Sequence, residues 1–138
     1  MYYHANTNAG SATVTITGKG RFSGSVEKAF QIQPADLSRS SVDLSADSFT
    51  YDGTEKKPSV TVKTGNRQLT ANSDYTVSFV NNTNAGSATV TVTGKGNYSG
   101  SVTKNFTISA ASLEKAELAL SASSFTYDGT EKKPDVTV

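Results

Sequence analysis

Histidine and cysteine, the residues that most often carry metal or nucleophilic chemistry, are almost absent from this 138-residue chain. His4 is the only histidine, and there is no cysteine. A tetrahedral zinc site needs several such ligands, and a Ser-His-Asp triad needs a histidine oriented by a carboxylate. We therefore expect no catalytic residue, no metal site and no cofactor-binding residue. The absence of cysteine also excludes disulfides and thiol chemistry.

A charged cluster that occurs twice is the next candidate. Asp52 and Glu55 lie beside Lys56 and Lys57, and residues 128–133 repeat the pattern. Two carboxylates at this spacing could act as general acid and base. Their repetition next to an Asp-Gly turn favours a simpler interpretation, the solvated polar face of a hairpin. We expect no enzymatic activity from this cluster.

Two glycine-rich segments, Gly94–Gly100 and its copy Gly18–Gly24, resemble phosphate-binding loops in composition. A phosphate loop opens onto a helix whose N-terminal amides hold the anion. No helical periodicity follows either segment, so we expect hairpin loops. Tyr98 and Phe22 are placed at the tips of these loops. Such aromatic rings could contact a sugar or a protein partner, or could cap the end of the core.

Composition excludes several classes of partner. The formal net charge is +1, which gives no electrostatic basis for binding nucleic acid or an anionic membrane surface. No apolar run approaches the roughly 18 residues that span a bilayer. Oxygen-bearing loop side chains could hold calcium, although they lack the regular spacing of a calcium-binding loop. The residues concerned are Asp43, Asp47, Asn81, Asn82 and Asn84.

The elements that position these residues are repeated along the chain. Residues 6–15 recur at 82–91, and the offset of 76 holds throughout. Setting residues 1–62 on residues 77–138 gives 62 pairs, of which 40 are identical. A period of 76 residues is too long for a solenoid unit and suits a small sandwich domain with its own core.

Within one period, apolar residues alternate with polar ones over short runs. The clearest run places Ala88, Val90 and Val92 between threonines. Alternation with a period of two, together with β-branched residues, predicts half-buried strands. Glycine and asparagine between the runs supply turns. About seven short strands per period indicate an all-β sandwich, with residues 37–42 and their copy 113–118 as linkers leading into a first strand.

The motifs of the period resemble a known family. In chain order they are Tyr51–Pro58, Asp74–Ser78, Asn84–Gly100 and Phe106–Ile108. Together they resemble the bacterial immunoglobulin-like (Ig-like) tandem repeats with a Tyr-Asp-Gly signature, over essentially the whole chain. Such repeats occur in large secreted or cell-wall-attached bacterial proteins, mostly as spacers and stalks. The resemblance implies tandem Ig-like β-sandwich modules, an extracellular or cell-surface location and no catalytic residue.

Two functions are compatible with such modules. We expect a non-catalytic structural spacer, because near-identical copies suit a stalk whereas recognition surfaces in tandem arrays usually diverge. The alternative is an adhesive module that binds a host glycan or protein through Phe22 and Tyr98. Some surface Ig-like domains also form a Lys-Asn isopeptide cross-link. Lys104 alternates in phase with Val102 and Phe106 and is therefore expected on the same face of the strand. This suggests either such a buried lysine or a lysine at the edge whose charged end reaches solvent.

The period predicts one complete module and parts of two others. Residues 1–36 are the C-terminal part of a first module, residues 37–112 a complete module and residues 113–138 the N-terminal part of a third. The end parts together hold every expected strand of a module, lacking only the equivalent of residues 63–76. Each is shorter than the roughly 40 residues that usually fold without a disulfide. We expect them either to stay disordered or loosely packed, or to dock head to tail between molecules.

Overall fold

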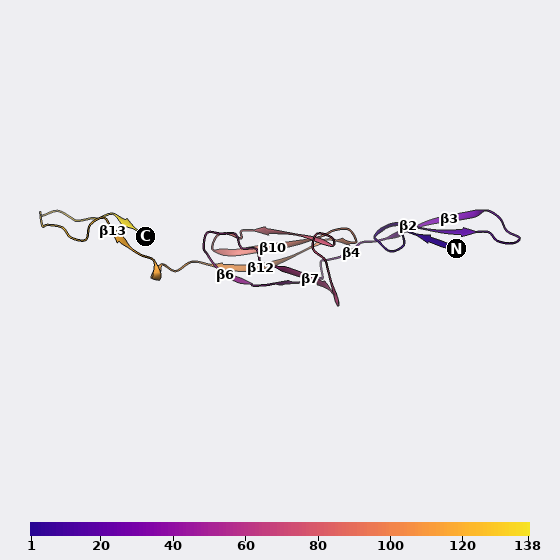
Figure 1. Cartoon of the computed structure of the whole chain (residues 1–138), viewed down its shortest axis with the longest axis horizontal. Coiled ribbons are helices and arrows are strands. Elements are labelled where there is room, and N and C mark those ends of the chain that lie inside the picture. Colours follow the sequence, from indigo (N-terminus) through magenta and orange to yellow (C-terminus); the bar gives the residue numbers. More distant parts are fainter.

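The structure, a computed structural model, describes all 138 residues as an extended row of three units (Figure 1). A three-stranded sheet forms one end, a unit of two sheets lies in the middle, and a small hairpin forms the other end. The N-terminus and the C-terminus lie in opposite end units. Apart from one turn of 3-10 helix, its regular elements are all β-strands, as the alternating pattern predicts.

The N-terminal unit is a single antiparallel sheet in the order β1-β2-β3. Its strands are β1 (Tyr2–His4), β2 (Gly10–Thr17) and β3 (Ser25–Ile32). Ala12 is its only fully buried residue. A single sheet of this kind has no second layer to cover its apolar face.

The central unit is a sandwich of two sheets. One sheet has the order β6-β12-β10-β9 and the other the order β5-β7-β8. The strands of the first sheet are β6 (Ser48–Thr50), β9 (Tyr75–Val80), β10 (Gly86–Gly94) and β12 (Ser101–Ser109). The strands of the second sheet are β5 (Ser41–Leu44), β7 (Val60–Thr64) and β8 (Arg67–Gln68). Two short strands at the edge, β4 (Ala35–Asp36) and β11 (Tyr98–Ser99), pair in parallel.

The C-terminal unit begins with a single turn of 3-10 helix, η1 (Leu113–Lys115), whose first turn is capped by the Ser112 hydroxyl accepting from the Glu114 amide. The hairpin strands β13 (Ala119–Leu120) and β14 (Val136–Thr137) follow. No residue of this unit is fully buried. Its apolar side chains therefore face solvent.

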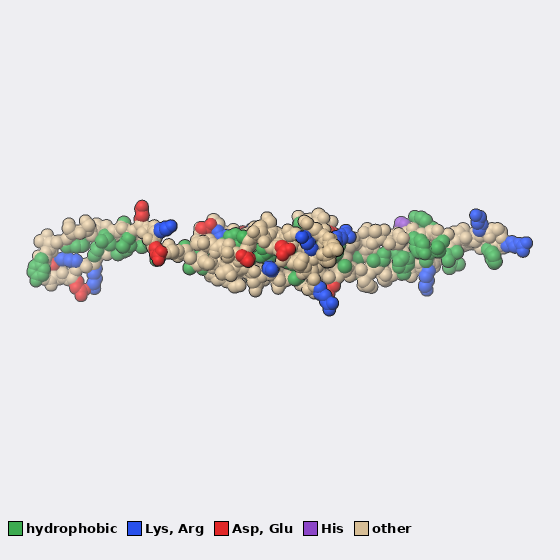
Figure 2. Space-filling view, turned by 90° about the horizontal axis from the view of Figure 1, so that it is seen from below, with side chains coloured by type: hydrophobic (Ala, Val, Ile, Leu, Met, Phe, Trp, Pro, Cys, Tyr) green, Lys and Arg blue, Asp and Glu red, His purple; other side chains and the backbone are tan.

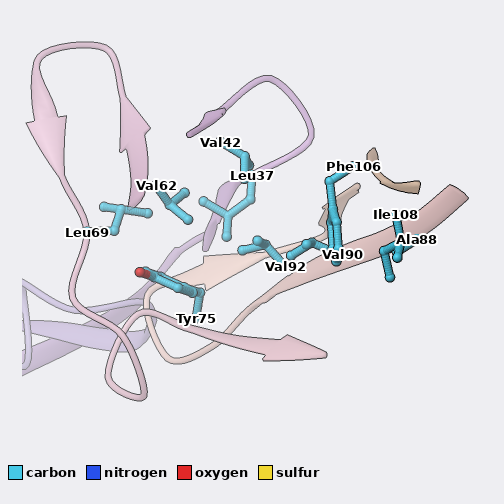
Figure 3. Close-up of a cluster of buried hydrophobic side chains, with 10 residues drawn as sticks. All are labelled: Leu37, Val42, Val62, Leu69, Tyr75, Ala88, Val90, Val92, Phe106 and Ile108. Atoms are coloured by element: carbon cyan, nitrogen blue, oxygen red, sulfur yellow. The ribbon is translucent and has the colours of Figure 1, made fainter. Parts of the chain in front are cut away.

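All ten residues of the main core belong to the central unit (Figure 3). They are Leu37, Val42, Val62, Leu69, Tyr75, Ala88, Val90, Val92, Phe106 and Ile108. The ring of Phe106 meets Phe49 edge-on, with 5.5 Å between ring centroids. The hydroxyl of Tyr75, on one sheet, donates to the carbonyl of Val60 on the other, over 3.3 Å. The two sheets are thus joined by apolar packing and by a hydrogen bond.

The expectation of an all-β, Ig-like sandwich is confirmed, and one detail of it is wrong. Residues 37–42 are not merely a linker, because Leu37 is fully buried in the core. The copy of Leu37, Leu113, is 74% exposed. The sequence pattern around these two leucines is polar and uninformative, so only the tertiary structure separates them.

Candidate functional site

The residues considered for catalysis or metal binding are spread over the molecule. His4 is exposed on β1, opposite Thr13. No three histidine, cysteine or acidic side chains come together anywhere in the chain. Of the proposed calcium ligands, Asn82 instead donates its side-chain amide to the Lys56 carbonyl, over 3.0 Å. Asp43 lies on β5, opposite Thr61.

The charged cluster after Tyr51 forms a tight polar turn. The Asp52 carboxylate accepts hydrogen bonds from the amide of Thr54 at 2.9 Å and from its hydroxyl at 2.6 Å. Lys56 Nζ lies 2.5 Å from the same carboxylate. The residues 128–133 repeat this arrangement, with Lys132 paired to Asp128. Glu55 pairs with Lys57 instead, so the two carboxylates are engaged separately.

This turn predicts a measurable pH response. The hydrogen bond from Lys56, followed by those from Thr54, holds the pKa of Asp52 well below its ordinary value of 3.8. The folded state therefore binds the proton less readily than the unfolded chain does. The stabilisation is present above about pH 4 and is lost as the pH falls through the lower, folded-state pKa.

We expect carbon-13 NMR titration of the side-chain carboxyls to show Asp52 titrating below 3.8. Thr54→Val removes the hydroxyl donor and should raise the Asp52 pKa toward that ordinary value. The second copy supplies an internal control, because Asp128 keeps its low pKa in the variant. An unshifted Asp52 in the wild-type chain would contradict the turn described above.

The two glycine-rich segments are hairpin loops, as expected, but their aromatic residues differ. Tyr98 lies on β11, half-buried and packed against the core. Phe22, its copy, is 78% exposed on the loop between β2 and β3. Only Phe22 is thus placed to contact a partner with its whole ring. Lys104 is exposed, so it does not provide the buried lysine that an isopeptide cross-link requires.

The joint between the N-terminal and central units is the most specific site in the structure. The side chain of Asn97 bridges to the preceding unit: its Oδ1 accepts from the Ala9 amide at 2.7 Å, and its Nδ2 donates to Asn8 Oδ1 at 3.0 Å. The backbone carbonyl of Asn97 accepts from the Ala35 amide at 2.9 Å. One residue of the central unit thus holds both the loop and the linker of its neighbour.

The linker itself is bound along the edge of the central sandwich. Ala35 and Asp36 pair with Tyr98 and Ser99, and the Leu37 amide donates to the Ser99 carbonyl at 2.9 Å. The Asp36 carboxylate accepts from the amide and hydroxyl of Ser38, and these bonds hold its pKa below its ordinary value. The chain therefore enters the central unit through paired backbone rather than through a free tether.

Glycine is required at one position of this joint. Gly100 has a φ of +76°, and a β-carbon there would collide with Asp36 Oδ1. A side chain at this position would be strained by its backbone and would also push the Asp36 carboxylate aside. Sequence reasoning missed Asn8, Asn97 and Asp36. The available signal was that two of them differ between the copies, since Arg21 stands at the position of Asn97 and Ser112 at the position of Asp36.

The sandwich and its turns now allow comparison with known proteins. Residues 50–110 match the family model of the bacterial Ig-like domain (group 3). The matched Ig-like region runs from β6 to the end of β12, and it covers less than half of the chain. Bacterial Ig-like domains are generally non-catalytic structural modules, typically of surface or extracellular proteins.

The remaining comparisons add no closer relative. Neither a curated protein nor a solved structure matches the chain. No helix of the structure has the length and apolarity to cross a membrane.

Proposed function

We propose that this chain is a non-catalytic spacer from the stalk of a bacterial cell-surface or secreted protein, built of tandem Ig-like repeats with the Tyr-Asp-Gly signature. The observation that carries the proposal is the joint at Asn97. It connects the N-terminal and central units end to end through hydrogen bonds and a paired linker. A spacer needs such a connection, because its length is useful only if the units do not fold back on one another.

The shape of the chain supports the same function. The units follow one another in a row, and on the face drawn in Figure 2 positive and negative side chains are scattered along it. The sequence of the repeat is kept at 40 of 62 paired positions, including the turn segments. The row of units gives the chain length, and a surface of mixed charge keeps it soluble, and these are the two properties that a spacer requires.

The spacer function predicts additive length. We expect small-angle X-ray scattering of dilute chains with one or two further copies of residues 37–112 to give a maximum dimension that grows by a constant increment per copy. Each added module would repeat the contacts of Asn97, because Asn84 and Ala85 stand in the repeat where Asn8 and Ala9 do. A dimension that stays constant or grows irregularly as modules are added would contradict a spacer.

The joint can be tested by removing the Asn97 side chain. Asn97→Ala deletes the acceptor of the Ala9 amide, and a hydrogen bond of this kind contributes about 0.5–1.5 kcal/mol. We expect hydrogen exchange at the Ala9 amide to become roughly 2- to 12-fold faster, since 1.4 kcal/mol is a factor of ten. Arg21→Ala, at the equivalent position of the other copy, should leave that exchange unchanged. Equal exchange in wild type and Asn97→Ala would mean that the bond does not form.

The adhesive alternative depends on a single observation, the 78% exposure of Phe22. We expect a binding module to recognise a glycan or a host protein through that ring and to lose the interaction in Phe22→Ala. A glycan array and a panel of host surface proteins, probed with both chains, test this function. Binding that is unaffected by Phe22→Ala, or no binding at all, would leave the spacer as the function.

A further inference from the structure

The two end units have the strand geometry of opposite halves of the central sandwich. In the N-terminal unit, Tyr3 lies opposite Val14, and Val14 lies opposite Lys28. Phe79, Val90 and Lys104 have the same relation in the central unit. Strands β1, β2 and β3 therefore reproduce β9, β10 and β12, which belong to one sheet of the sandwich. Only the edge strand of that sheet, β6, has no equivalent in the N-terminal unit.

The C-terminal unit reproduces the facing sheet. Leu120 lies opposite Val136, as Leu44 lies opposite Val60. The amide of Ser121 donates to the carbonyl at position 135 over 2.9 Å, and the same bond joins residues 45 and 59 at the same distance. The Asp128 turn also repeats the Asp52 turn. Each end unit thus keeps the strand pairing of its half of a module, although no second sheet packs against it.

The faces that these halves would bury in a sandwich are apolar and largely exposed, with Ala12 as their one buried residue. Of the ten core residues of the central unit, eight have a counterpart in one of the end units, and every counterpart is apolar. Ile16 is 57% exposed, whereas its copy Val92 is fully buried. Figure 2 shows hydrophobic side chains gathered on both end units. Exposed patches of this kind mark surfaces that bind a partner.

The edge strand shows most directly which partner is missing. Residues Ser48–Thr50 form β6 because they pair in parallel with β12. Residues 124–126 have the identical sequence, yet they form no strand. The strand that they would pair with in a complete module is β3, at the other end of the chain.

We propose that residues 113–138 of one copy of this chain dock on residues 1–36 of a second copy and rebuild a β-sandwich between the two molecules. The central unit supplies the contacts. Phe125 would meet Phe30 as Phe49 meets Phe106. The backbone amide of Lys132 would donate to Asn6, and the Asn6 side chain would donate back, as Lys56 and Asn82 do over 2.7 and 3.0 Å.

The partner is a second copy rather than the other end of the same molecule. The two end units lie at opposite ends of the row, separated by the whole central sandwich (Figure 1). Residues 1–36 have a net charge of +1 and residues 113–138 a net charge of −2, so the two surfaces attract weakly. Each docked molecule still offers one free surface of each kind, so the assembly is head to tail and can extend into a chain.

Sedimentation of the full 138-residue chain tests the association. Between about 1 μM and about 1 mM, the range of weak to moderate affinities, we expect the mean mass to rise above the monomer value of 14.5 kDa and to continue past the dimer. A mass that stays at 14.5 kDa throughout would overturn the proposal.

Paired variants test which surfaces meet. Ile16→Asp places a charge on the buried face of the N-terminal half, whereas Thr17→Asp places it on the opposite face. Phe125→Asp and Thr126→Asp form the same pair in the C-terminal half. We expect Ile16→Asp and Phe125→Asp to be monomeric and both threonine variants to assemble as wild type does. Assembly of Phe125→Asp would overturn the docking surface.

A mixture distinguishes complementary ends from other modes of association. Ile16→Asp retains an intact C-terminal half and Phe125→Asp an intact N-terminal half. Their equimolar mixture should form dimers and stop there, because the second pair of surfaces is blocked on both chains. This outcome also shows that the intact halves remain folded in each variant. A mixture that stays monomeric while wild type assembles would overturn head-to-tail docking.

The absence of cysteine allows the register to be tested directly. Thr107 and Ser48 are paired across β12 and β6, and their counterparts are Gln31 and Ser124. A chain with Gln31→Cys and Ser124→Cys should form a ladder of disulfide-linked oligomers under mild oxidation. A chain with Thr17→Cys and Ser124→Cys, in which the two positions lie on unrelated strands, should not. Equal ladders from both chains would overturn the register.

Discussion

Phe106→Ala should remove a large part of the stability of the central sandwich. The Phe106 side chain is 2% exposed, lies opposite Ala88 and packs edge-on against Phe49. Truncation of a buried phenylalanine costs about 3–5 kcal/mol, through lost transfer free energy and the cavity that remains. A domain of this size has a total stability of only about 5–15 kcal/mol. Urea unfolding followed by far-ultraviolet circular dichroism should show a midpoint shifted strongly to lower urea.

The chain provides a matched control for this substitution. Phe30 is the copy of Phe106, lies opposite Ala12 as Phe106 lies opposite Ala88, and is 39% exposed. In dilute solution, where the end units are free, Phe30→Ala should lower the free energy of unfolding of the central unit by less than about 0.5 kcal/mol. Comparable losses from both substitutions would mean that the N-terminal unit shares a core with the central one.

The strands of the complete sandwich were the most predictable part of the fold. The alternation around Ala88, Val90 and Val92 predicts one buried face, and all three residues are fully buried. Period-two patterning works here because every strand of the sandwich has one face toward the core and one toward water. The hairpin loops follow from their glycines for an equally local reason.

The same patterns could not predict where a strand lacks a partner. Residues 48–50 and 124–126 are identical, and only the first set forms a strand. Val92 and Ile16 have the same neighbours in sequence, yet only Val92 is covered by a second sheet. Local propensity is shared by both copies, whereas burial depends on residues that are distant in the chain. The repeat pattern therefore predicts the structure that a segment adopts only where its neighbouring strand and facing sheet are also present.

The contacts at the joint could not be predicted from the sequence, for a different reason. Asn97, Asn8 and the linker at Ala35 meet only because two units are stacked end to end. Asparagine in a loop is ordinarily explained by turn geometry, so its type alone does not indicate a contact 88 residues away. The glycine-rich pattern also predicts Tyr98 at a loop tip. In the structure Tyr98 pairs in parallel with β4, and this pairing explains why its ring is half-buried.

Leu37→Ala should have the second-largest effect on stability. Leu37 is fully buried where the linker enters the sandwich, and its amide is bonded to the Ser99 carbonyl. Leucine-to-alanine substitutions at such sites cost about 2–5 kcal/mol. Because the residue adjoins the paired linker, the loss should also increase hydrogen exchange at the Ala35 amide, which bonds to Asn97. Thermal unfolding and hydrogen exchange on one sample measure both effects.

Leu113→Ala is the control, and it also separates the two environments of this leucine. Leu113 is 74% exposed in the free chain, so its truncation should leave the unfolding of the central unit unchanged in dilute solution. At concentrations where chains associate, Leu113 takes the buried place that Leu37 has in the complete module, and the substitution should then weaken assembly. If Leu113→Ala lowered the stability of dilute chains as much as Leu37→Ala does, the C-terminal unit would have to pack on the central core. If it left assembly unchanged, the docked halves would not reproduce the central sandwich at its entrance.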